Sequence, residues 1–113
     1  MTKNLQEKMF RDMEHKEIFK QAQNYAFEYA DNALDRNVFP TGQAIKKLVE
    51  FVEDMPDGTG DAAHILAQLN KYGSPATVSQ IGGRYFGFVN GGVLPVSLAA
   101  RWLSDFWDQN TAL

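Results

Sequence analysis

The stretch GGRYFGFVNGGVLP, residues 82–95, is the most distinctive part of this 113-residue chain. Residues 82–92 hold five glycines and three aromatic side chains. Because aromatic and β-branched residues favour a pleated surface, Tyr85–Val89 is predicted to be a short strand. Asn90–Gly92 is predicted to form a turn that needs positive φ, which glycine adopts at little steric cost. Pro95 then suits the first turn of a final helix.

The final helix is expected to run from Pro95 to about Gln109. Its apolar side chains cover more than half of its circumference, so it needs burial on most sides. One arrangement packs this helix centrally among the other helices. The other covers it with a partner subunit or with polypeptide beyond Leu113, since the chain stops four residues past Gln109. The side chains concerned form two lines, Leu98–Trp102–Phe106 and Ala99–Leu103–Trp107.

Upstream of residue 82 the chain is predicted to be helical, with turns between the helices. Leu5 to Leu34 has helical spacing without proline or glycine, and a break is expected near Glu14–Lys16 because thirty residues is long for one globular helix.

Two shorter helices follow. Thr41 is expected to cap the first, which carries Ile45, Leu48, Val49 and Val52. Asp61 is expected to cap the second, which carries Ile65, Leu66, Leu69 and Tyr72 and ends at Gly73. Residues 55–60, MPDGTG, are predicted to be a loop between them.

Composition excludes several classes of function. Fourteen acidic and eleven basic residues give a net charge of −3, and no basic stripe offers nucleic acid a surface. The absence of cysteine excludes disulfides, thiolate zinc sites and a cysteine nucleophile. No apolar run approaches the roughly 20 residues of a membrane helix, and no signal peptide is evident. The chain is therefore expected to be cytoplasmic, with neither nucleic acid nor membrane as a partner.

No complete catalytic constellation is found in the residues themselves. The spacings of the P-loop and of the dinucleotide-binding motif do not occur. Asp61 and His64 could share a metal, but two ligands make a weak site, so no metal is expected. His15 lies in a charged run and is interpreted as part of a solvated face. Lys46 and Lys47 flank an apolar stripe and are interpreted as solvent-facing rather than as Schiff-base lysines.

Several segments resemble one family, the group II amino-acid decarboxylases that depend on pyridoxal 5'-phosphate (PLP). The similarity extends over about residues 18–113 and is most specific at residues 82–95. The family includes the aromatic-amino-acid and glutamate decarboxylases. The other matching segments are RNVFP (36–40), GSPAT (73–77), LAARWL (98–103) and WDQN (107–110).

This resemblance implies a fold and a partner. The present chain is expected to be mainly α, with about four helices and a short extended glycine- and aromatic-rich segment. The intact family protein is α/β, of the fold-type-I PLP-dependent transferase class. Residues 1–113 would be its N-terminal helical segment, which wraps around the partner subunit of a homodimer, and the large PLP-binding domain is absent.

The resemblance also implies a site and a reaction. The intact protein would use PLP as an electron sink to decarboxylate an L-amino acid. Its substrate side would be lined by the loop residues Phe86, Phe88, Val89, Asn90, Gly91 and Gly92. The family's Schiff-base lysine, in a His-Lys motif, has no counterpart here, so this chain alone is expected to be inactive and to bind no PLP. A non-enzymatic helical dimerisation protein is the alternative.

Overall fold

The structure is a computed structural model that describes residues 2–87 and 92–110, with side chains from residue 4 onward. It is mainly helical, and neither of these two stretches contains a β-strand. The described residues form five α-helices: α1 (Thr2–His15), α2 (Glu17–Asn32), α3 (Gly42–Lys46), α4 (Ala62–Gln68) and α5 (Pro95–Trp107). A 3₁₀ turn (Lys47–Phe51) extends α3. A π-helical turn (Leu69–Gly73) and a 3₁₀ turn (Ser74–Ala76) extend α4.

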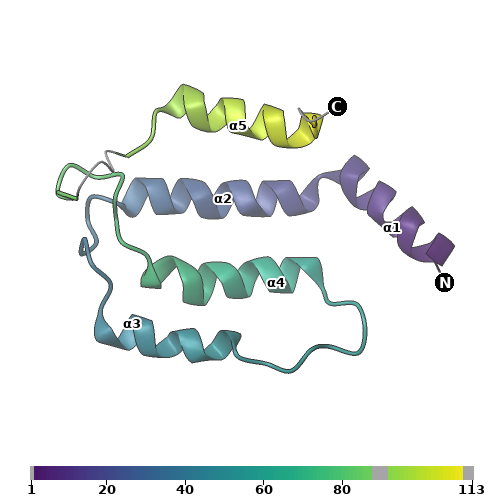
Figure 1. Cartoon of the computed structure of the whole chain (residues 1–113), viewed down its shortest axis with the longest axis horizontal. Coiled ribbons are helices and arrows are strands. Elements are labelled where there is room, and N and C mark those ends of the chain that lie inside the picture. Colours follow the sequence, from purple (N-terminus) through teal and green to yellow (C-terminus); the bar gives the residue numbers. More distant parts are fainter. Residues whose placement is uncertain (1, 88–91, 111–113) are drawn as a thin grey trace.

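The helices lie side by side in one layer, in the spatial order α5, α2, α4, α3 (Figure 1). The edge of the Phe19 ring on α2 meets the Phe106 ring on α5, with 5.0 Å between the ring centroids. Phe51 and Tyr72 make a similar contact between the turns that follow α3 and α4. Helix α1 projects beyond the start of α2, away from the layer (Figure 1).

A single layer of helices leaves almost no interior. The radius of gyration is 17.3 Å, whereas a compact chain of this length has about 13 Å. Ala33 and Ser79 alone are buried among the described side chains. The arrangement with the final helix at the centre is therefore wrong, because α5 lies at an edge of the layer and every residue in it is exposed.

Local signals place the helix boundaries well. The predicted break lies at Lys16, whose φ of 61° is left-handed and ends α1. The Thr41 hydroxyl caps α3 by accepting a hydrogen bond from the Ala44 N–H at 3.1 Å. Asp61 precedes α4 as expected, although its carbonyl, not its carboxylate, accepts the Ile65 N–H. Pro95 occupies the first turn of α5, which ends at Trp107 rather than Gln109.

Two local predictions need correction. Gly73 does not end the helix, because its φ of −80° is right-handed and helical turns continue to Ala76. Tyr85–Gly87 is not a strand. A strand needs a partner for its hydrogen bonds, whereas the Tyr85 N–H bonds back to the Gly82 carbonyl in a turn. Phe88 and Val89, the rest of the predicted strand, lie outside the described residues.

Candidate functional site: an anchored glycine-rich loop

Of the six predicted loop residues, the structure describes Phe86 and Gly92. Phe88, Val89, Asn90 and Gly91 lie outside the described residues. The Phe86 side chain is 93% exposed, so no pocket forms around it in this chain. Gly92 has the predicted positive φ, at 90°, which a residue with a Cβ rarely adopts. The described part of the predicted site is thus an open surface.

The two ends of this loop lie against each other. A Cβ on Gly92 would stand 3.5 Å from the Ile81 Cα and 3.7 Å from the Gln80 carbonyl oxygen. Gly92 and residues 80–81 therefore form a neck for the intervening segment. We call Gln80, Ile81 and Gly92 the loop neck.

An arginine at the end of α2 holds the chain just before this neck. The Arg36 guanidinium donates to the carbonyls of Ser74, Pro75 and Thr77, at 3.1, 3.3 and 2.8 Å. It also donates to the Thr77 hydroxyl at 3.3 Å and lies 5.2 Å from the centre of the Tyr29 ring. We call these five residues, Tyr29, Arg36, Ser74, Pro75 and Thr77, the Arg36 clasp.

The clasp satisfies groups that a helix end leaves without partners. The last carbonyls of a helix have no intrahelical donor and carry partial negative charge, which favours a cation. Thr77 adds to the arrangement because its hydroxyl donates to the Ser74 carbonyl at 2.8 Å and bonds the Tyr29 hydroxyl at 2.8 Å. The end of α2 and the end of the α4 extension are thereby joined by one shared set of hydrogen bonds.

Ser79 continues this attachment toward the loop neck. Its side chain is 1% exposed, and its hydroxyl donates to the Ala33 carbonyl at 2.9 Å. Its N–H donates to the Val38 carbonyl at 2.7 Å. Beyond the neck, the Arg84 guanidinium donates to the Arg36 carbonyl. The loop is therefore tied to the end of α2 on both sides of Ile81.

Sequence reasoning missed Arg36 and Ser79 as individual residues. Arg36 appeared in a matching segment, RNVFP, and its partners appeared in another, GSPAT. Nothing in the spacing of the two segments indicates that they touch, because about forty residues separate them. The available signal was that Arg36, a cation close to Pro40, could donate hydrogen bonds to the carbonyls at the end of another helix.

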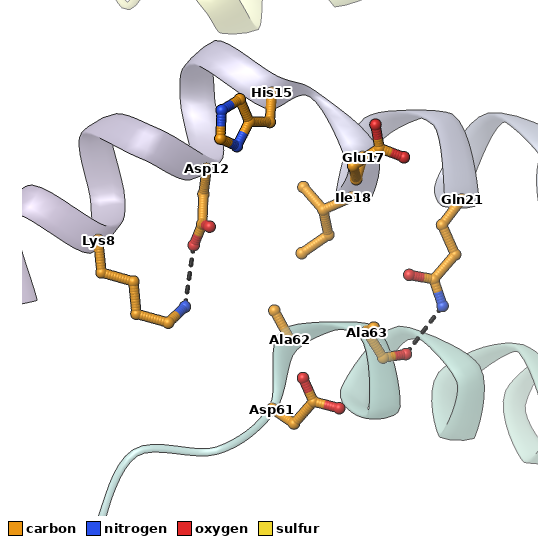
Figure 2. A pocket seen from close by; sticks show the side chains of 9 residues that line it. All are labelled: Lys8, Asp12, His15, Glu17, Ile18, Gln21, Asp61, Ala62 and Ala63. Carbon is orange, nitrogen blue, oxygen red and sulfur yellow. Dashed lines mark hydrogen bonds and ion pairs between the residues drawn. The ribbon is translucent and has the colours of Figure 1, made fainter.

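A separate hollow lined by charged side chains lies between the α1–α2 elbow and the start of α4 (Figure 2). It has a volume of about 230 Å³. Lys8 pairs with Asp12 at 3.0 Å, and the Gln21 amide donates to the Ala63 carbonyl at 2.8 Å. His15 also lines this hollow, whose charged side chains are all exposed. A more apolar groove of about 390 Å³ runs between α2 and the α4 extension, beside Tyr25 and Tyr29.

Lysines and clustered His, Asp or Glu side chains are the groups in the described residues that could hold PLP or a metal. PLP forms a covalent bond to a lysine held in a pocket, whereas the described lysine side chains are all exposed. Lys46 and Lys47 face solvent as predicted. In residues 2–87 and 92–110 no group of three or more His, Asp or Glu side chains is placed to bind a metal, and His64 is exposed near Asp61. The lysines concerned are Lys8, Lys16, Lys20, Lys46, Lys47 and Lys71.

Comparison with known proteins gives no match to a family model, to a curated protein or to a solved structure. Within the described stretches, no helix has both the length and the apolar character needed to cross a membrane.

Proposed function

We propose that this chain is the N-terminal segment of a PLP-dependent amino-acid decarboxylase, a cytoplasmic homodimer that acts on an L-amino acid. The observation that carries the proposal is the resemblance of residues 82–95, GGRYFGFVNGGVLP, to the group II decarboxylases. Two further matching segments, residues 36–40 and 73–77, contact each other through the Arg36 clasp. That contact supports the proposal because two segments that resemble the same family are joined by one set of hydrogen bonds.

The exposed face of α5 supports a homodimer. Trp102, Leu103, Phe106 and Trp107 are 47% to 63% exposed on one short helix. Apolar patches of this kind on a folded surface mark places where another protein surface binds. In the proposed protein the partner subunit covers this face.

The proposed cofactor requires residues outside this chain's described part. The described lysine side chains are exposed, and the proposal assigns the lysine that binds PLP to another part of the protein. The present residues would contribute the loop near the substrate. They would hold and orient the amino acid rather than carry out bond breaking.

The first test is the reading frame downstream of the Leu113 codon. Continuation into a large domain with a His-Lys motif, followed by PLP binding and release of CO₂ from an amino acid, is the expected result. A stop codon directly after Leu113 would contradict the proposal.

The second test labels the 113-residue chain with PLP, reduces it with borohydride and maps the peptides. No lysine is expected to take up one equivalent of PLP, because each described lysine side chain is exposed to solvent rather than held in a pocket. Stoichiometric labelling of one lysine would contradict the assignment of the cofactor lysine to another part of the protein.

A non-enzymatic dimerisation protein is the second candidate. The exposed α5 face favours it equally, and it needs no cofactor lysine. The reading frame separates the two candidates, because a dimerisation protein needs no domain after Leu113.

A further inference from the structure

We propose that Arg36 is a positioning residue that holds the described start of the glycine-rich loop, the loop neck and residues 82–87, against the turn that follows α2. What the loop does once placed rests on the proposed function. The placement itself follows from the contacts of Arg36, Ser79 and Arg84.

Among the described side chains, that of Arg36 makes the most hydrogen bonds. Four hydrogen bonds leave one guanidinium and reach Ser74 and Pro75 in the α4 extension and Thr77 directly after it. A planar guanidinium with five donors suits this fan of acceptors, while an ammonium group does not. Hydrogen bonds from a charged donor are also stronger than neutral ones.

The clasp is close enough along the chain to control the neck. Three residues separate Thr77 from Ile81, and between them lies Ser79, which is buried and bonded to the Ala33 and Val38 carbonyls. The clasp holds residues 74–77, and the Ser79 bonds hold the chain two residues before Ile81. Because the backbone of so short a run has little slack, displacement of Thr77 pulls on the Ser79 bonds and, through them, on Ile81.

Arg84 adds a contact within the loop, three residues past Ile81. Its guanidinium donates to the carbonyl of Arg36 itself. Arg36 thus contacts the chain before the neck through its side chain and the first part of the loop through its backbone carbonyl.

Native-state hydrogen exchange of the 113-residue chain tests the placement. Arg36→Lys keeps the positive charge but loses the planar guanidinium with its five donors. In this variant, hydrogen exchange of the Ser79 amide and of the amides of residues 80–87 is expected to accelerate at least about tenfold. The Ile65 amide, bonded to the Asp61 carbonyl in α4, is the internal reference and should change by less than about twofold. Arg101→Lys on α5 is the matched control and should leave residues 79–87 unchanged.

Two results would overturn the proposal. One is unchanged exchange of residues 79–87 in Arg36→Lys. The other is equal acceleration at Ile65, which would mean that Arg36 supports the whole fold rather than the loop. If Arg36→Lys does not fold, Thr77→Val replaces it, because it keeps the side-chain shape and removes only the hydroxyl shared by Arg36, Tyr29 and Ser74.

The catalytic consequence is tested in the full-length protein. Arg36→Lys is expected to raise KM for the amino acid at least about threefold with unchanged PLP content and melting temperature. A normal KM together with accelerated exchange would overturn the positioning role. If the wild-type protein decarboxylates no amino acid, the proposed function fails, and the exchange comparison still decides whether Arg36 places the loop.

Discussion

Individual side chains at the ends of helices account for much of the order in this chain. The Thr41 hydroxyl accepts a hydrogen bond from the first turn of α3, and the Ser79 hydroxyl donates to the Ala33 carbonyl at the end of α2. The Arg36 guanidinium donates to the Pro75 and Thr77 carbonyls at the end of the α4 extension.

Replacement of Thr41 by alanine is expected to lower the free energy of unfolding by about 1 kcal/mol, because the Ala44 N–H loses its acceptor. Urea titration followed by circular dichroism would measure the difference. Thr59→Ala, in the loop before α4, is the matched control and should change stability by less than about 0.5 kcal/mol. Equal effects of the two substitutions would show that the cap contributes nothing.

Asn90→Ala in the full-length protein is expected to weaken substrate use, lowering kcat/KM while leaving PLP content and melting temperature nearly unchanged. The reason is that a polar side chain beside glycines can reach a ligand, as the family resemblance implies for this loop. Gly92→Val should act differently and lower the melting temperature, since its φ of 90° strains any β-branched residue. Normal kinetics with a lowered melting temperature in Asn90→Ala would show that the loop is scaffold.

At the scale of helices, α1 and α5 differ from the rest in being weakly attached. Helix α1 joins α2 through one left-handed residue, Lys16, and its apolar side chains remain exposed. Helix α5 contacts α2 chiefly through Phe106 and Phe19. The α2, α3 and α4 region carries the clasp and the Phe51–Tyr72 ring contact, so it is expected to be the more stable unit.

Removal of residues 1–15 is therefore expected to shift the melting temperature by less than about 2 °C, since few packed contacts are lost. Differential scanning calorimetry of the shortened chain beside the complete one would measure the shift. Ala26→Pro, in the middle of α2, provides the contrast and should abolish cooperative melting because proline breaks a helix interior. A large loss of stability on removing α1 would mean that α1 packs against the layer in solution.

At the scale of the whole molecule, the open layer of helices is expected to self-associate. Burial of about 400 Å² of apolar surface at about 25 cal/mol per Å² contributes roughly 10 kcal/mol, against association costs of about 4–15 kcal/mol. Sedimentation velocity at micromolar concentration should show a dimer. Trp102→Asp is expected to weaken the dimer at least about tenfold, because it places a charge in the covered face.

Met55→Asp, in the exposed loop before α4, is the matched control and should leave the dimer intact. A wild-type chain that sediments only as a monomer, and binds no hydrophobic dye, would contradict the prediction.

Local chemistry in the sequence was enough to predict the helices and most of their ends. Apolar spacing identified every long helix, and Thr41, Asp61 and Pro95 stand where the structure begins helices. These features depend on neighbours within one or two turns, so the sequence itself contains the needed information. The break at Lys16 was predicted differently, from the length of the helical spacing, which the sequence also displays directly.

Only the tertiary structure decided which surfaces are covered and which segments meet. The central packing of α5, one of the two arrangements that the sequence left open, and the strand predicted at Tyr85 both depended on neighbours that the sequence does not specify. The Arg36 clasp joins residues about forty positions apart, through hydrogen bonds whose acceptors are backbone carbonyls. Every residue carries a backbone carbonyl, so no pattern of side chains marks which ones an arginine will bind.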